Sequence, residues 1–269
     1  MSEQQILDSS SQMAAPPADG RMPVSIVAAA GLAAFGMMAA AQPAFAITPV
    51  LTLADVPGKG NIQILNYALA LEDLEAELYA QALQRLTTGG TGGGNASSSV
   101  GTITGLGLNA SQRDVHFTAE FATVENTHAK YLRAKIGGLG GPVIAPFKYD
   151  FGIQTMTEHQ VISLIFTAEK TGVMAYLGAV PFLDKSSSLT PTVFQIAGSI
   201  QGTEARHTAI FAEILRLQFG DQIDVTPLPS PPYSNKPPFT NASPNNKGID
   251  APEPPNSVLD AVSPFIKTS

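Results

Sequence analysis

Two glutamate–histidine pairs with the same spacing are the residues of this sequence best suited to chemistry. Glu125 precedes His128 by three residues, and Glu204 precedes His207 by three residues. On a helix, three residues make about one turn, so the carboxylate and the imidazole of each pair project from one face. Carboxylate oxygens and imidazole nitrogens are ligands that iron and manganese accept. The two pairs therefore predict a metal site.

Two further glutamates interrupt apolar stripes that otherwise have helical spacing. Glu72 is followed seven residues later by Tyr79, and Glu169 is followed seven residues later by Tyr176. Four carboxylates in one core would be costly and would repel each other unless cations neutralise them. We therefore predict that two divalent ions, Fe or Mn, are bound by six side chains, namely Glu72, Glu125, His128, Glu169, Glu204 and His207.

Neighbouring residues could support or replace these ligands. Glu75 lies one turn from Glu72 on nearly the same face, so either could be the ligand or Glu75 could lie behind it. Tyr79 and Tyr176 are expected either to hydrogen-bond a ligand from a neighbouring helix or to be core aromatics. The remaining helical glutamates are predicted on solvated faces, namely Glu77, Glu120, Glu158 and Glu213.

Four long helices must position the ligands. Apolar spacing predicts helices over about 61–86, 111–136, 156–183 and 191–219, with Ser111 as an N-cap and Gly137-Gly138 as a stop. No segment alternates with period two strongly enough to predict a sheet. Each of the four glutamates lies thirteen or fourteen residues from one predicted helix end. That distance is about 21 Å, so the four can meet in one layer.

The links between the helices predict the topology. The link between helices three and four is short, so these helices are antiparallel neighbours, and helices one and two form a second hairpin. Residues 137–155 could span roughly 60 Å when extended, which is more than the helix length of about 40 Å and lets this link travel the full length of the bundle. We expect an all-α bundle over residues 56–221, made of two antiparallel hairpins joined by a long crossover. Residues 222–269 form an irregular Pro/Asn-rich tail whose apolar segment, 258–266, docks on the bundle.

Composition excludes other classes of protein. The chain has 15 Lys and Arg against 22 Asp and Glu, a net charge of −7, without a basic stripe for nucleic acid. Cysteine is absent, which excludes thiolate metal ligands. No charged residue lies between Met22 and Ala54. Residues 1–46 are therefore expected to be a signal peptide cleaved after Ala46, which would make the protein periplasmic, secreted or part of the cell envelope. An uncleaved membrane anchor is the alternative.

Three segments carry a resemblance to a known family. Residues 65–75, 125–128 and 169–178 resemble the ferritin-like domain family of exported bacterial proteins, which also takes in fungal stress-response and plant desiccation-related proteins. The likeness covers about residues 62–219, with a short echo in 258–266. It implies a ferritin-like bundle with di-iron or di-manganese binding. The spacing of Glu72 and Tyr79 is also similar to bacterioferritin and rubrerythrin, which favours Glu72 over Glu75.

Three functions are compatible with a predicted four-helix bundle that binds two metal ions. The first is a redox protein that uses dioxygen or peroxide, as a ferrous-iron oxidase or with manganese-catalase-like activity. The second is a non-enzymatic stress or desiccation protein, or an envelope scaffold, with a structural metal site. The third is iron storage. The ligand set does not decide whether the protein is an enzyme, which metal it binds, or whether it forms a homo-oligomer.

Overall fold

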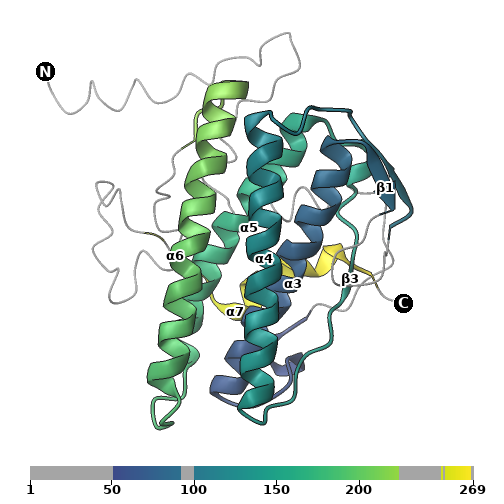
Figure 1. Ribbon diagram of the computed structural model, residues 1–269. Coiled ribbons are helices and arrows are strands. Elements are labelled where there is room, and N and C mark those ends of the chain that lie inside the picture. Colours follow the sequence, from purple (N-terminus) through teal and green to yellow (C-terminus); the bar gives the residue numbers. More distant parts are fainter. Residues whose placement is uncertain (1–50, 92–99, 224–249, 251, 268–269) are drawn as a thin grey trace, which may run out of the picture.

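Four long helices run side by side in the computed structural model, which describes residues 51–91, 100–223, 250 and 252–267. They are α3 (Asn61–Leu86), α4 (Arg113–Gly138), α5 (Glu158–Ala179) and α6 (Thr190–Ile214). Helices α3 and α4 form one hairpin, α5 and α6 form the other, and the chain between them returns along the length of the bundle (Figure 1). The predicted all-α four-helix bundle is confirmed. The predicted signal peptide and residues 224–249 of the tail lie outside the described residues.

Local signals explain where the last two helices begin and end. Thr157 caps α5 by accepting a hydrogen bond from the Gln160 amide, while the Gln160 side chain accepts one from the Thr157 amide. Pro191 lies in the first turn of α6, where its missing N–H costs nothing. After α6 the chain makes a π-helical turn, Leu215–Phe219, and stops at Gly220, whose φ of 78° suits glycine.

Three predicted helix ends were wrong. Ser111 does not cap α4, because its hydroxyl donates to the Asn109 side chain, and Gln112 is the residue before the helix. Gly137 and Gly138 belong to the last turn of α4, and the chain turns away at Gly140, where φ is 72°. Helix α5 ends at Ala179 rather than Leu183, because a 3-10 turn containing Pro181 follows it.

Two short β-ladders were not predicted. Strand β1 (Gly89–Thr91) pairs with β2 (Thr102–Thr104), and β3 (Lys148–Tyr149) pairs with β4 (Ile266–Lys267), both antiparallel. Strands of two or three residues are too short to show an alternating pattern. The second ladder joins the crossover to the end of the chain.

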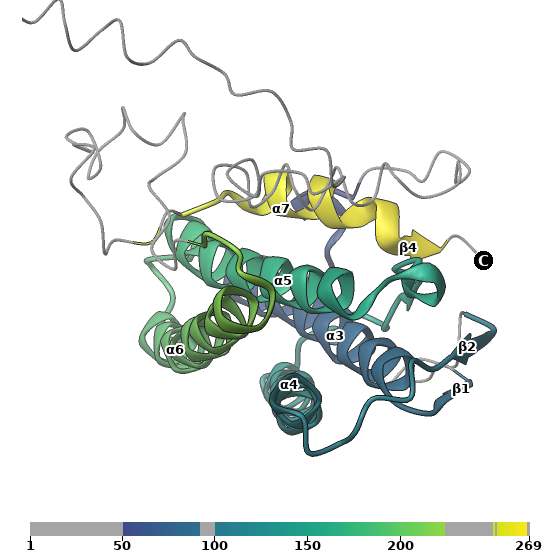
Figure 2. The same ribbon diagram turned by 90° about the horizontal axis from the view of Figure 1, so that it is seen from above.

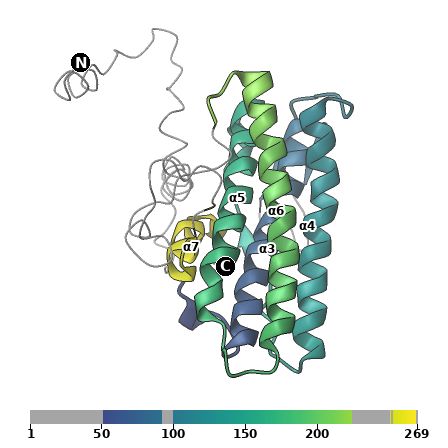
Figure 3. The ribbon, with the colours of Figure 1, turned by 90° about the vertical axis from the view of Figure 1, so that its left-hand side faces the viewer.

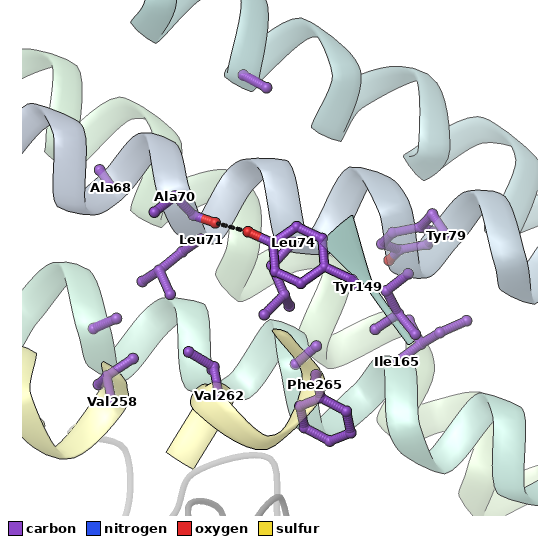
Figure 4. Close-up of a cluster of buried hydrophobic side chains, with 14 of the residues drawn as sticks. Ala68, Ala70, Leu71, Leu74, Tyr79, Tyr149, Ile165, Val258, Val262 and Phe265 are labelled. Atoms are coloured by element: carbon purple, nitrogen blue, oxygen red, sulfur yellow. Dashed lines mark hydrogen bonds between the residues drawn. The ribbon is translucent and has the colours of Figure 1, made fainter. Parts of the chain in front are cut away.

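The C-terminal helix α7 (Pro255–Val262) covers the outer side of α5 (Figures 2 and 3). The amide of Glu253 donates to the Met174 carbonyl of α5 at 3.0 Å. Val258, Val262 and Phe265 are buried against the bundle (Figure 4). By length and composition Glu158–Phe182 could also cross a membrane, but 89% of its apolar window is buried inside the bundle.

The crossover covers one face of α3, and this changes the environment of Glu77. The Tyr149 hydroxyl donates to the Ala70 carbonyl of α3 at 3.1 Å (Figure 4). The Gln81 side-chain amide contacts both Glu77 and the Tyr149 carbonyl, each at 3.0 Å. Glu77 is therefore buried, and its predicted place on a solvated face was wrong. Of the other three glutamates, Glu120 and Glu213 are exposed and Glu158 is half-buried.

Candidate metal centre

Six side chains from the four helices meet inside the bundle. The four glutamates Glu72, Glu125, Glu169 and Glu204 are 0% exposed. The side chains of His207 and His128 are 3% and 12% exposed. We call these six residues the carboxylate–imidazole cluster. They are the six residues for which the sequence predicts metal binding, and the structure brings all of them together.

The cluster divides into two groups that share two members. One group is Glu72, Glu125, His128 and Glu204, and the other is Glu125, Glu169, Glu204 and His207, with the donor atoms of each group within 4.8 Å of one another. Glu125 and Glu204 belong to both groups. Each group is completed by one further glutamate and one histidine. This arrangement has the form of two adjacent ion sites with two shared carboxylates.

His128 sits among three carboxylates from three helices. Its Nδ1 lies 3.1 Å from Glu72 Oε2, 3.0 Å from Glu125 Oε2 and 3.2 Å from Glu204 Oε1. One nitrogen carries at most one proton, so it cannot donate to three carboxylates at once. The three oxygens around this nitrogen form a polar pocket of the kind that a cation would fill.

His207 takes the matching position in the second group. Its Nδ1 lies 2.9 Å from Glu125 Oε1 and 3.3 Å from Glu169 Oε2. The ring of Phe121 stacks on the imidazole, with centroids 3.8 Å apart and planes 19° apart. Phe121 therefore fixes the plane of the ring and keeps water away from this side of the cluster.

Burial and mutual contact shift the pKa values of the cluster. Burial raises the pKa of Glu125 to about 7, although its contacts with the two imidazoles act in the opposite direction. Burial and the Glu125 charge hold the pKa of Glu204 well above its usual range. Burial lowers the pKa of the imidazoles, but their carboxylate neighbours outweigh it and raise it to about 12 for His128 and about 9 for His207. The cluster therefore holds protons that a metal ion would displace.

Several polar atoms of the cluster are buried and, although they lie close to one another, their contacts do not have the geometry of a hydrogen bond. Among the described residues they include Glu125 Oε1, Glu169 Oε2, both carboxylate oxygens of Glu204, and His207 Nδ1. Orphaned polar atoms are rare in protein interiors because each costs about 1–3 kcal/mol. Oxygen and imidazole donors without thiolate suit Fe or Mn. The residues present therefore fit a metal site.

Two tyrosines of the bundle each donate a hydrogen bond to a cluster glutamate on the other hairpin. The hydroxyl of Tyr79, on α3, donates to Glu169 Oε1 on α5. The hydroxyl of Tyr176, on α5, donates to Glu72 Oε1 on α3 at 2.5 Å. In both glutamates the other oxygen, Oε2, faces a histidine. Each tyrosine therefore fixes a carboxylate of the opposite hairpin and leaves one oxygen turned toward the centre.

Glu75 is buried beside the cluster but belongs to neither group. Burial and the Glu204 charge hold its pKa well above the usual range. It faces Gly172 of α5, where a Cβ would lie 3.1 Å from Glu75 Oε1 and 3.3 Å from Glu204 Oε2. The geometry thus places Glu72, rather than Glu75, among the donors. Gly172 was not identified from the sequence, although an isolated glycine inside an apolar helix is a signal of close packing.

An apolar pocket lies beside the cluster, with Tyr176 between the pocket and Glu72. It has a volume of about 350 Å³ with its mouth included, and its surface is wholly apolar. Small side chains line the pocket, among them Ala68 and Ala175. Tyr176, whose hydroxyl donates to Glu72, also lines it. Ala197 on α6 is the only lining residue that is not buried, so it marks the mouth. The enterable space holds about one or two molecules of the size of water.

The other two histidines lie away from the cluster. His116 pairs with Glu120 on the surface of α4 at 3.4 Å, and His159 pairs with Asp221 at 2.8 Å. Neither belongs to a group of metal-binding residues within the described part of the chain.

Residues 60–217, more than half of the chain, match the family model described as "Ferritin-like domain". No curated protein and no solved structure matches the chain.

Proposed function

Because the chain belongs to the ferritin-like domain family, we propose that its carboxylate–imidazole cluster binds two iron or manganese ions. The observation that carries this proposal is the pair of overlapping donor groups that share Glu125 and Glu204. Four carboxylates bring a charge that two divalent ions would cancel when the imidazoles are neutral. Glu72 with His128 would complete one ion site, and Glu169 with His207 would complete the other.

We propose that the bound centre is redox-active. Iron or manganese ions would supply electron transfer and Lewis-acid activation of dioxygen or peroxide. The protein residues would orient and shield them. Tyr79 and Tyr176 keep one oxygen of Glu169 and of Glu72 directed inward, which is how outer residues tune metal ligands. Phe121 and the surrounding apolar side chains exclude water.

The apolar pocket supports dioxygen as the oxidant. Dioxygen is apolar and close to water in size, so it suits a small wholly apolar space. Hydrogen peroxide would lose its hydrogen bonds to water there without replacement. The pocket therefore favours oxidation of ferrous iron or of another electron donor by dioxygen, over peroxide breakdown of the manganese-catalase kind.

We also propose that the protein acts outside the cytoplasm in oxidative or desiccation stress. The uncharged stretch from Met22 to Ala54 and the resemblance to exported stress-related proteins support this setting. A stress protein or envelope scaffold with a purely structural metal is the competing function, and iron storage is the third. The same cluster would serve all three.

Elemental analysis of the purified protein tests metal binding. Wild-type protein loaded with Fe or Mn should contain about two ions per chain, and Glu204→Ala should contain less than one, because both sites lose a shared ligand. Glu213→Ala is the matched control, since Glu213 lies on the same helix but is exposed. A folded wild-type protein that takes up no metal would refute the proposal.

Oxygen uptake then separates the functions. Ferrous protein should consume dioxygen, and Ala197→Leu, which narrows the mouth of the pocket, should slow this reaction without lowering the metal content. A loaded protein that consumes neither dioxygen nor peroxide would have a structural site. A large cage in solution would indicate iron storage.

A further inference from the structure

One end of the bundle exposes apolar side chains. At the lower end in Figure 1, where α3 and α6 begin and α4 and α5 end, lie five of the eight large apolar residues that are exposed in the described part of the chain. They are 37–54% exposed, and they are Leu139, Val143, Val180, Phe182 and Phe194. We call this surface the apolar end.

The loops at the apolar end have an unusual composition. After α4 the chain reads Leu-Gly-Gly-Pro-Val-Ile-Ala-Pro over residues 139–146, and after α5 it reads Val-Pro-Phe-Leu over 180–183. Only Ile144 and Leu183 of these two stretches are buried. Surface loops are ordinarily polar, and grouped exposed apolar residues mark an interaction surface. The opposite end carries only Leu106 and Leu217 of the eight.

Charge at the apolar end differs from that of the whole chain. Lys59, Lys135 and Lys185 are exposed there. The acidic residues beside them are Asp55 and Asp184, whose carboxylates already accept hydrogen bonds from Thr52 and Ser186. The end is therefore slightly basic, although the chain carries a net charge of −7. Apolar side chains with lysines among them suit anionic lipid, because lysine stems lie along apolar surface while their charges reach the headgroups.

The chain that precedes α3 runs from the side of the bundle, where the Leu51 amide donates to Ser263 Oγ at 3.0 Å, to the apolar end. The stretch Met22–Ala54 has no charged residue, and the chain then reaches the lower end of the bundle at Gly60, just before α3 begins. Two apolar ends facing each other would bring lysines against lysines, whereas an anionic bilayer complements these lysines. We infer that the apolar end docks on a lipid bilayer that contains anionic lipids.

Two tryptophan reporters test this docking in the full chain. The protein has no tryptophan, so each substitution gives one unambiguous signal. Phe182→Trp places the reporter at the apolar end, where Phe182 is 46% exposed, and Leu217→Trp places the control at the other end, where Leu217 is 54% exposed. The probe is a vesicle of phosphatidylcholine and phosphatidylserine in which the acyl chains are brominated. We expect quenching by about half for Phe182→Trp and almost none for Leu217→Trp.

The charge contribution is tested by Lys185→Glu in the Phe182→Trp background. Removal of the positive charge of Lys185 should by itself weaken vesicle binding about fivefold at low salt. The negative charge that glutamate adds should weaken binding further. Three outcomes would overturn the inference. They are equal quenching of both reporters, binding through the N-terminal segment with neither reporter quenched, and a vesicle-independent emission shift of Phe182→Trp that grows with protein concentration. The last would assign this surface to a second copy.

Discussion

Replacing Gly178 by alanine should destabilise the fold, although the same change normally stabilises a helix. The residue lies in α5, where the C-terminal segment crosses it. A Cβ at this position would lie 1.6 Å from the Glu253 carbonyl oxygen and 2.3 Å from its carbonyl carbon. Carbon and oxygen in contact need about 3.3 Å, so the crossing segment would have to move by roughly 1.5–2 Å.

The cost follows from what that movement breaks. The hydrogen bond from the Glu253 amide to the Met174 carbonyl would be lost, at about 1 kcal/mol. Partial exposure of Val258 and Val262, which are buried by α7 docking, would cost roughly 2 kcal/mol more. The helix propensity of alanine returns about 1 kcal/mol. We expect a net loss of about 2 kcal/mol in the free energy of unfolding.

Urea unfolding of Gly178→Ala beside Gly198→Ala measures this difference. Gly198 lies in α6, and a Cβ there would meet nothing within 4 Å. The control should therefore gain about 0.5–1 kcal/mol. If both variants became more stable by similar amounts, the close crossing of α5 by the C-terminal segment would not exist in solution.

Three further perturbations have defined outcomes. Tyr79→Phe and Tyr176→Phe should each weaken metal binding at least tenfold, because a cluster carboxylate loses the hydrogen bond that orients it. Competition with a chelator measures the affinity, and an unchanged affinity would show that both tyrosines are core residues only. Burial and a neighbouring carboxyl raise the pKa of Glu158 to about 7, so the folded state binds the extra proton and stability should fall as pH rises from about 5 to 7. Because this side chain is partly exposed, its contribution should be on the order of 1 kcal/mol, and unfolding curves of Glu158→Gln should show a fall with pH that is smaller than that of the wild type by this amount. Arg133→Met should cost about 3 kcal/mol in urea unfolding, because it leaves Asp73 buried without its ion pair at 2.7 Å; a loss within error would show that the pair is not formed.

The sequence was sufficient to predict the helices and the meeting of the six cluster side chains in one layer. Apolar spacing predicted both ends of α3, because apolar residues recur at helical spacing from Leu65 to Leu86 on both sides of Glu72. The glutamates of the cluster could be found because each interrupts such a stripe at a matching height. Glu125 and Glu204 could be paired with their histidines because both partners lie on one helix, so the distance depends only on local geometry.

What the sequence did not predict depends on contacts between distant segments. The burial of Glu77 follows from where the crossover lies on α3, and no local pattern encodes that position. Gly172 is needed because α3 lies so close to α5 that a Cβ at this position would lie 3.1 Å from Glu75 Oε1. Ser111 has good N-cap chemistry, but its hydroxyl bonds to Asn109 instead. The apolar pocket depends on four helices at once, and alanine spacing in one helix does not reveal it.

The crossed tyrosines make the two hairpins interdependent. Each hairpin carries one Glu with a Tyr seven residues later and one glutamate–histidine pair, yet its tyrosine braces the glutamate of the other hairpin. A single hairpin could not assemble a braced centre, whereas two copies related by a twofold axis could. The arrangement is therefore what duplication and fusion of a dimerising hairpin would leave behind. Metal capture and docking of the two halves would then be one event during folding.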